Sequence, residues 1–322
     1  MSQVVKITSV KIALPERAQF YLSGQLPDDV TATWYAEPEH AVSAVAAATI
    51  AWLDIFPPDV NRAIDAGRDL GWVFTAFAGV GTFPLPAMRN RGIVFTNGAG
   101  LHNVPVAEYT VMGMLAAAKN LRAVVHSQDR REWLLDSPGK GELFQTKALI
   151  IGYGQIGRAI AQRLRGFGVE VTGVRRRASA GEPGVLGPSE WRARLADFDW
   201  IILAAALTNA TRHLIGEAEL AGMRSTAWII NIGRGGLIDQ QALVAAATRG
   251  TIGGAFLDVT DPEPAPPDDP IWSTRNVLVT SHVSGRAQTR TTERAASLFL
   301  ENLARYRSSR PLINTVDFDH GY

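Results

Sequence analysis

The 322-residue chain contains no cysteine, which excludes disulfides, thiolate metal sites and a cysteine nucleophile. It also lacks any run of about 20 apolar residues, so the sequence predicts no membrane span. The first residues include no long apolar segment of the kind found in signal peptides. We therefore expect a cytoplasmic protein, and we assign it no metal ligands.

An excess of charge of either sign is missing too. The chain has 32 Lys and Arg against 31 Asp and Glu, which gives a formal net charge of +1. This balance gives no indication of a nucleic-acid or membrane-surface partner. Hydrophobic residues make up 46% of the chain, as in ordinary globular proteins. The length favours two domains of ordinary size over one large domain.

A glycine-rich turn lies between an apolar run and a helical pattern in residues 147–177, KALIIGYGQIGRAIAQRLRGFGVEVTGVRRR. Gly152 permits the tight turn, Gly154 lets a pyrophosphate approach the backbone, and Gly157 lets the helix pack close to the strand. The pyrophosphate would sit at the helix N-terminus, where free N–H groups favour negative charge. A glycine turn without a ligand is the alternative, but the strand–turn–helix–strand context favours a dinucleotide site. The predicted cofactor-binding residues of this turn are Gly152, Gly154, Gln155, Ile156 and Gly157.

Three arginines, Arg175, Arg176 and Arg177, stand where an acidic residue normally accepts hydrogen bonds from the ribose 2′-OH. Guanidinium groups suit a 2′-phosphate because their planar fork binds phosphate with two parallel hydrogen bonds. We therefore predict NADP(H) in preference to NAD(H). The alternative is a solvated basic turn.

The sequence predicts an α/β fold with a Rossmann dinucleotide-binding domain inserted into a smaller, flavodoxin-like α/β substrate domain. Six apolar strands are expected in the larger domain, a full Rossmann count, at 148–151, 169–174, 200–205, 226–232, 252–259 and 276–280. Shorter runs at 4–14, 31–35, 49–53, 71–77 and 93–96 alternate with helical segments and predict a second parallel sheet. A helix over 290–308 cannot extend the six-stranded sheet, so we expect it to cross back. The substrate domain is then 1–97 with 284–322, the dinucleotide domain is 98–283, and the cleft between two domains is the expected ligand site.

Charged side chains follow three predicted strands, where the sites of parallel sheets converge. Arg234 comes after the strand at 226–232, Asp258 lies at the end of the strand at 252–259 with Glu263 after it, and His282 follows the last strand. One Arg, one acid and one His suffice for hydride transfer to a 2-oxo acid. The Arg pins the carboxylate and polarises the carbonyl, the His acts as general acid, and the acid orients the imidazole.

Each of these residues has a plainer interpretation. Glu263 lies among prolines and by itself would be a solvated loop acid. His282 could be a hydrogen-bonded histidine at a strand end. Arg234, flanked by glycines after a buried strand, is a poor candidate for a packing residue.

In the first domain, the loop 78–81 follows a predicted strand, and Gly79 and Val80 could present backbone N–H groups to a small anion. A plain turn is the alternative. Trp52 could form a wall of the substrate pocket, and Trp133 could contact a partner subunit, although large aromatic residues are more often found in cores.

The chain resembles the D-isomer-specific 2-hydroxyacid dehydrogenases. The resemblance covers nearly the whole chain and is strongest over 104–285. It rests on VAEYTV, IIGYGQIGRAIAQRL, LTNATRHLI, INIGRGGLIDQQAL, FLDVTDPEPAPPDDPIW and VLVTSHVSG.

The resemblance implies roles for particular residues. Arg234, Glu263 and His282 match the family's catalytic Arg, Glu and His. Asp258 matches the residue that binds the nicotinamide carboxamide, and Gly79 with Val80 matches the loop that holds the substrate carboxylate. The positions that line the cofactor are Thr110, Thr208 and Ile232. A discontinuous small domain and a homodimer formed through the large domain are also implied.

The chain departs from the family pattern at two places. Gly81 stands where the family often has a polar residue, and Ser281 stands where it commonly has proline. Neither change removes a catalytic group. The loop 100–103 and the arginine cluster are most similar to the glyoxylate/hydroxypyruvate reductase branch. Formate dehydrogenases have Gln where this chain has Glu263, which argues against formate oxidation.

The expected activity is reduction of a small 2-oxo acid by NADPH, with glyoxylate and hydroxypyruvate as first choices. Two alternatives remain open. One is a dinucleotide-sensing binding protein or corepressor of the same fold, and the other is a dehydrogenase of another small anion such as phosphite.

Overall fold

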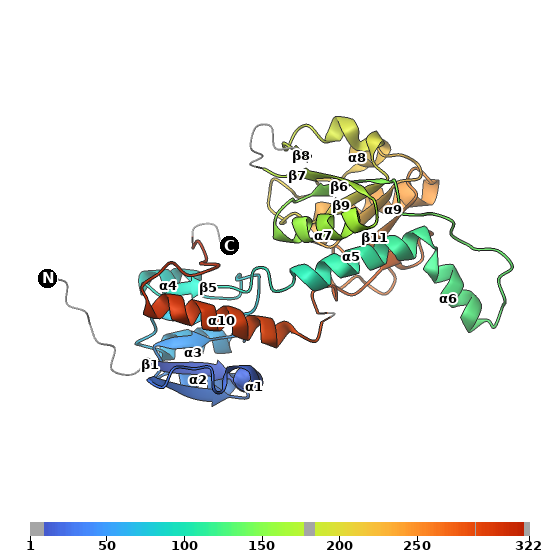
Figure 1. The fold of residues 1–322 in the computed structure, drawn as a ribbon. Coiled ribbons are helices and arrows are strands. Elements are labelled where there is room, and N and C mark those ends of the chain that lie inside the picture. Colours follow the sequence, from blue (N-terminus) through green and yellow to red (C-terminus); the bar gives the residue numbers. More distant parts are fainter. Residues whose placement is uncertain (1–9, 177–183, 287, 319–322) are drawn as a thin grey trace. The chain divides into compact units, whose positions relative to one another are not determined.

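The computed structural model describes residues 10–176, 184–286 and 288–318. The chain forms two compact units (Figure 1). Unit 1 combines Met1–His102 with Gln288–Tyr322, and unit 2 is Asn103–Ala287. The divisions fall a few residues from those expected at 97/98 and 283/284. No helix among the described residues is both long and apolar enough to cross a membrane.

Unit 1 contains a five-stranded sheet in the order β2-β1-β3-β4-β5. All neighbouring strands are parallel. The strands are β1 (Val10–Pro15), β2 (Val30–Tyr35), β3 (Ile50–Trp52), β4 (Trp72–Phe74) and β5 (Val94–Thr96). This strand order is that of flavodoxin-like folds, as the sequence analysis predicted.

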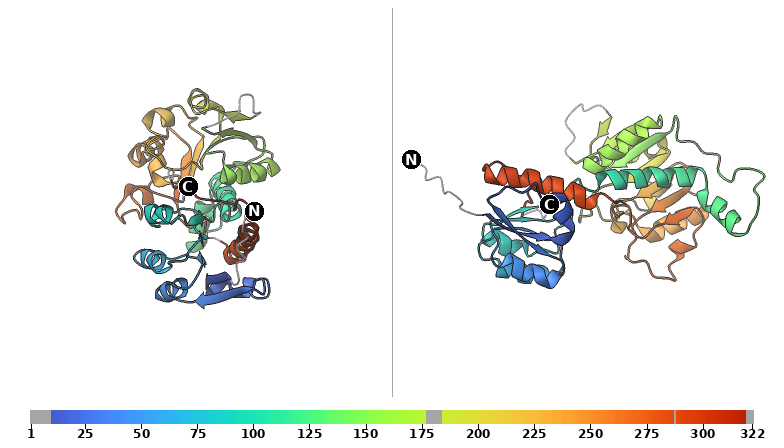
Figure 2. Two further views of the ribbon diagram at one scale, coloured as in Figure 1. Left: turned by 90° about the vertical axis from the view of Figure 1, so that its left-hand side faces the viewer. Right: turned by 60° about the horizontal axis from the view of Figure 1, so that its bottom comes forward.

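Helices cover both faces of this sheet, with α10 on one face and α2 and α3 on the other (Figure 2). Side chains alternate between the faces: Ile12 and Leu14 pack with Phe299 of α10, whereas Ala13 packs with residues of α2 and α3. The elements are η1 (Glu16–Ala18), α1 (Gln19–Leu22), α2 (Pro38–Val45), α3 (Asp59–Ala66), α4 (Leu85–Asn90) and α10 (Thr291–Arg307). The helix expected at 290–308 therefore completes unit 1.

Unit 2 contains a seven-stranded parallel sheet in the order β12-β11-β10-β9-β6-β7-β8. Counted from β6, this is the doubly wound order 3-2-1-4-5-6 with one strand added at the edge. The strands are β6 (Lys147–Ile151), β7 (Glu170–Val174), β8 (Val185–Leu186), β9 (Trp200–Leu203), β10 (Trp228–Asn231), β11 (Gly254–Leu257) and β12 (Val277–Val279). The expected count of six was wrong because β8, only two residues long, carries no recognisable apolar run.

Helices also cover both faces of the larger sheet. Ile150 of β6 packs with residues of α5 and α7, whereas Leu149 and Ile151 pack with residues of α8 and α9. The remaining elements of unit 2 are α5 (Asn103–Ala118), α6 (Leu121–Asp129), α7 (Gln155–Gly166), η2 (Arg192–Asp197), α8 (Glu217–Ala221), η3 (Gly235–Leu237), α9 (Gln240–Arg249) and η4 (Pro270–Trp272).

Candidate active site

The glycine turn joins β6 to α7, and its geometry accommodates a pyrophosphate. Gly152 has a φ of 104°, and a Cβ there would lie 2.4 Å from the carbonyl carbon of Ala204. A Cβ at Gly157 would lie 2.4 Å from the oxygen of Gly152. At Gly154, the N-cap of α7, a Cβ would have no atom within 4 Å. The turn is therefore closed to side chains where the backbone segments touch and open where an anion would approach the helix N-terminus.

The arginine cluster begins at the end of β7. Arg175 is partly buried, and its backbone N–H donates to the carbonyl of Leu186 in β8. The next residue, Arg176, is exposed, while Arg177 lies outside the described residues. At least two guanidinium groups thus follow the second strand of the doubly wound sheet.

The three positions expected to line the cofactor differ in accessibility. Thr208 is exposed in the loop after β9, and Ile232, directly after β10, is 7% exposed. Thr110 is fully buried in α5, and its hydroxyl donates to the carbonyl of Val106 at 2.8 Å. The side chain of Thr110 therefore reaches no surface in this structure, and its place beside the cofactor stays a prediction.

Glu263 and His282 form a close pair. His282 Nδ1 lies 2.6 Å from Glu263 Oε1, and each side chain is 41% exposed. A proton on Nδ1 satisfies this contact and leaves Nε2 to exchange a proton with a ligand. The residues are separated by 19 positions in the chain, so the tertiary structure brings them together.

Arg234 lies in a loop that the side chain of Asn231 shapes. Asn231 is 1% exposed, donates from Nδ2 to the carbonyl of Arg234 at 3.0 Å, and accepts from the N–H of Gly233 at 3.1 Å. A Cβ at Gly235 would lie 1.9 Å from the carbonyl oxygen of Thr260. The Arg234 loop therefore packs directly against the segment that follows β11. The side chain of Arg234 itself is exposed.

Asp258, at the end of β11, organises the loop that carries His282. Its carboxylate is 1% exposed and accepts from the Thr280 hydroxyl at 2.6 Å and from the N–H groups of Val283 and Ser284 at 3.0 Å. Burial alone would raise the pKa of Asp258, but hydrogen bonds from Ser284, Thr280 and the backbone outweigh burial and hold the pKa below its usual value. The cofactor contact that the resemblance implies for Asp258 stays a prediction, whereas its contacts with the His282 loop are observed.

Asp258, Glu263 and His282 line a cavity of about 360 Å³ in unit 2, whereas Arg234 is not among its lining residues. Its walls combine the acidic and basic groups with apolar surface. The lining residues are Asp258, Thr260, Glu263, Pro264, Ala265, Trp272, Val279, Thr280, Ser281, His282 and Arg286. Among the residues that the structure describes, no group of three His, Asp or Glu side chains is arranged to hold a metal ion.

In unit 1, the predicted anion loop is anchored at its base. Asp54 accepts from the N–H of Ala76 at 2.6 Å, and Asn97 Nδ2 donates to the carbonyl of Ala78 at 2.8 Å. Gly79 is exposed, whereas the Val80 side chain is 2% exposed and belongs to the core. Val80 can therefore meet a ligand only through its backbone.

The proposed role of Trp52 as a wall of the substrate pocket is wrong. Its ring is fully buried and stacks on Phe299 at a centroid separation of 5.6 Å, and its Nε1 donates to Asp54 at 2.7 Å. The alternative of a core residue is correct, because the ring packs against Phe299 and its Nε1 has a hydrogen-bond acceptor inside unit 1.

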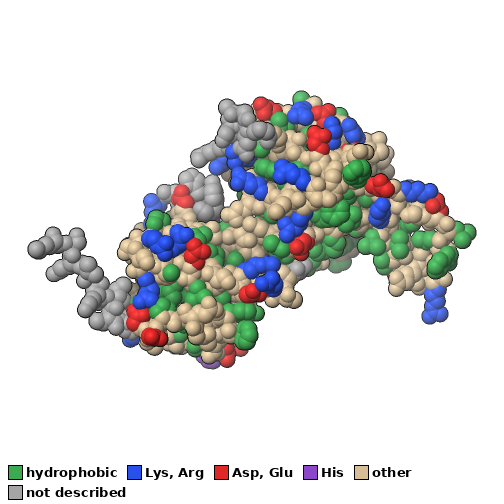
Figure 3. Space-filling model, viewed as in Figure 1, with side chains coloured by type: hydrophobic (Ala, Val, Ile, Leu, Met, Phe, Trp, Pro, Cys, Tyr) green, Lys and Arg blue, Asp and Glu red, His purple; other side chains and the backbone are tan. Residues whose placement is uncertain are grey.

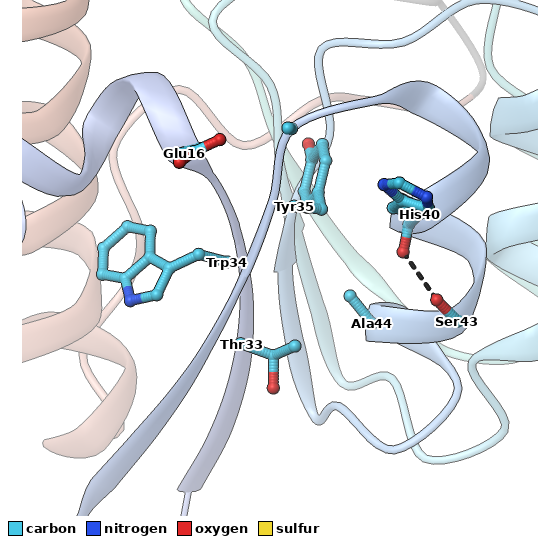
Figure 4. A pocket seen from close by; sticks show the side chains of 8 residues that line it. Glu16, Thr33, Trp34, Tyr35, His40, Ser43 and Ala44 are labelled. Atoms are coloured by element: carbon cyan, nitrogen blue, oxygen red, sulfur yellow. Dashed lines mark hydrogen bonds between the residues drawn. The ribbon is translucent and has the colours of Figure 1, made fainter.

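A second opening of about 370 Å³ lies in unit 1 beside the ends of β1 and β2 (Figure 4). Glu16, Tyr35 and His40 are among its lining residues. The hydrogen bond drawn there runs from Ser43 Oγ to the backbone carbonyl of His40 at 2.9 Å. Among the residues that line this opening, no acid and base are paired as Glu263 and His282 are. We therefore assign the opening no ligand.

Comparisons with known proteins agree with this geometry. Residues 111–284 match the model of the D-isomer specific 2-hydroxyacid dehydrogenase NAD binding domain. A glyoxylate reductase of Korarchaeum cryptofilum is 34% identical over 235 residues, which cover 70% of each chain. A D-3-phosphoglycerate dehydrogenase of Methanocaldococcus jannaschii is 34% identical over 222 residues, which cover 68% of this chain and 42% of that protein.

A solved structure extends the likeness to both units. The NADPH-dependent glyoxylate/hydroxypyruvate reductase of Sinorhizobium meliloti, in complex with NADP and malonate, has a TM-score of 0.72 and 25% sequence identity. The match covers 96% of this chain and 97% of that one. The chain therefore belongs to the D-isomer specific 2-hydroxyacid dehydrogenase family and is an NAD(P)-dependent 2-hydroxyacid dehydrogenase.

Proposed function

We propose that this protein reduces a small 2-oxo acid, such as glyoxylate or hydroxypyruvate, to the 2-hydroxy acid with NADPH. The observation that carries the proposal is the 2.6 Å contact between Glu263 and His282 at the edge of a cavity. A carboxylate-paired imidazole can donate a proton where a carbonyl oxygen gains negative charge. The names of similar proteins, a glyoxylate reductase and a glyoxylate/hydroxypyruvate reductase, support the substrate class.

In this proposal each residue has a separate task. NADPH, when bound, supplies the hydride that the carbonyl carbon receives. Glu263 accepts a hydrogen bond from Nδ1–H and orients the ring, so that His282 Nε2 protonates the carbonyl oxygen. Arg234 holds the substrate carboxylate with its planar guanidinium, and the N–H groups of Gly79 and Val80 are a further proposed contact. The test is turnover of NADPH by the purified protein with a panel of 2-oxo acids, and a complete lack of turnover would refute the proposal.

Cofactor preference is proposed to depend on the arginines after β7. At equal concentrations we expect NADPH to raise the melting temperature more than NADH, because the cofactor with the lower Kd stabilises the folded state more. A ligand at about 100 times its Kd contributes about 2.7 kcal/mol. The Arg176→Asp variant should lose most of the NADPH shift, since an exposed guanidinium is replaced by a charge that repels phosphate. A thermal-shift titration with both cofactors measures this.

The matched control is Arg275→Asp, which changes an exposed arginine elsewhere in unit 2. It should keep the wild-type preference. Equal shifts with NADH and NADPH in the wild type would contradict the NADP(H) assignment and favour a solvated basic turn.

A homodimer formed through unit 2 is also proposed. Hydrophobic side chains gather over α6 and the loop that follows it (Figure 3). Trp133 is 90% exposed and Leu135 is 97% exposed. Large apolar patches on a protein surface mark interaction sites, and a second copy of the same chain is the occupant that the family resemblance implies.

We expect the Trp133→Ser, Leu135→Ser double variant to shift the protein from dimer to monomer in size-exclusion chromatography with light scattering, because it removes apolar area from the interface. Phe20→Ser is the control, since Phe20 is 86% exposed but lies in unit 1. A wild-type monomer, or a double variant that stays dimeric, would contradict this interface.

A further inference from the structure

Arg286 holds the backbone of the segment that carries His282. Its Nη2 donates to the carbonyls of Ser281 and His282, both at 2.9 Å, and its Nε donates to the His282 carbonyl at 3.2 Å. A guanidinium presents its donors in a rigid planar fork, so it can bridge two neighbouring carbonyl groups. Two successive peptide groups are thereby tied to one side chain.

The backbone of His282 needs such support. Its φ is 51°, in the left-handed region that residues other than glycine seldom occupy. A conformation of this kind is strained and persists only where the surroundings hold it. The preceding residue, Ser281, has no ring to restrict its own φ. The segment therefore depends on hydrogen bonds for its shape.

Asp258 and Arg286 hold this segment through groups of opposite polarity. The Asp258 carboxylate accepts from the N–H groups of Val283 and Ser284, and its backbone carbonyl accepts from the N–H of His282 at 2.7 Å. Arg286 donates to carbonyl groups of the same segment. An anion thus binds backbone donors while a cation binds backbone acceptors. Charge-assisted hydrogen bonds of this type are stronger than neutral ones.

We infer that Arg286 is a positioning residue for His282: it fixes the backbone from which the imidazole reaches Glu263 and the cavity, without itself contacting the reacting atoms. This inference rests on the proposed reduction of a 2-oxo acid. Both Arg286 and His282 line the same cavity, so a displaced segment changes the direction in which the ring presents its free nitrogen. A small misplacement of a catalytic group is enough to slow a reaction by about 100-fold.

The test compares Arg286→Ala with Arg275→Ala, which removes another exposed arginine of unit 2. In Arg286→Ala we expect kcat to fall by roughly 10- to 100-fold, with the KM values for NADPH and the 2-oxo acid nearly unchanged. Guanidinium ion at millimolar concentration should restore part of the lost kcat, because it can occupy the vacated position. Arg286→Lys should be intermediate, since an ammonium cannot reproduce the planar fork. Arg275→Ala should keep its kcat and show no response to guanidinium.

Two kinetic results would overturn the inference. One is a wild-type kcat in Arg286→Ala. The other is a loss that appears mainly in the KM of the 2-oxo acid, which would make Arg286 a substrate-binding residue.

Amide hydrogen exchange separates this inference from the proposed function. If the wild-type protein turns over no 2-oxo acid, the proposed function fails, but the positioning role can still be decided. Exchange in the peptide containing residues 281–284 should be faster in Arg286→Ala than in Arg275→Ala, because the segment loses its carbonyl partners. Equal exchange in the two variants would overturn the role of Arg286.

Discussion

Replacement of His282 by alanine is expected to lower kcat by roughly 100- to 10,000-fold, the usual contribution of a general acid. The imidazole is the group paired with Glu263 at 2.6 Å, and alanine leaves no proton donor at that position. NADPH should still raise the melting temperature of the variant, because the glycine turn and the arginines lie on other elements. Steady-state kinetics and a thermal-shift titration on the same preparation measure both effects.

The control for this substitution is His40→Ala, which changes an exposed histidine of unit 1. It should keep the wild-type kcat. Glu263→Gln provides a second comparison: the amide keeps the size of the side chain but removes the carboxylate that contacts the ring at 2.6 Å. We expect the kcat of Glu263→Gln to lie between the values of His282→Ala and the wild type.

The same experiment distinguishes an enzyme from a dinucleotide-sensing protein of the same fold. A sensor would keep its cofactor-dependent output when His282 is replaced, because such an output needs binding and no proton transfer. Turnover in His282→Ala at the wild-type rate would contradict the catalytic role of this histidine and favour the sensor.

Substitution of Gly157 by alanine is the second change with a large expected effect. The new Cβ would lie 2.4 Å from the oxygen of Gly152 and 3.2 Å from Cγ2 of Ile150, so α7 must move away from β6. Such overpacking costs about 1–3 kcal/mol. A change of 1 kcal/mol shifts the melting temperature by about 2–4 °C in domains of this size. We expect a lower melting temperature, and a weaker shift with NADPH because the N-terminus of α7 moves.

Gly166→Ala is the matched control in the same helix. A Cβ there would have no atom within 4 Å, and alanine is the better helix former by up to about 1 kcal/mol. The two substitutions should therefore change the melting temperature in opposite directions. A stable Gly157→Ala variant with normal NADPH binding would show that the close approach of α7 to β6 is not required.

Local patterns in the sequence predicted much of this protein. The fingerprint of Gly152, Gly154 and Gly157 is a short pattern between a strand and a helix, so the dinucleotide site can be predicted from neighbouring residues. Except for β8, the strands of both sheets were identified because they are short apolar or β-rich runs, and their parallel order follows from alternation with helices. Arg234, Glu263 and His282 were chosen as candidate catalytic residues because each follows a predicted strand, where sites in parallel sheets converge.

Tertiary structure decided the features that depend on contacts between distant residues. Asp258 binds the loop after β12 across 22 to 26 positions of the chain, and no local pattern predicts those partners. Trp52 and Thr110 were assigned to ligand sites, yet the packing of α10 and the helical position of Thr110 bury them completely. Strand β8 is too short to leave a pattern and exists because β7 offers it a partner edge. The sequence by itself determined which chemical groups are present and on which elements they lie, because those depend on neighbours in the chain. Their partners and their burial were decided by the tertiary structure, because long-range hydrogen bonds and packing depend on how the elements meet.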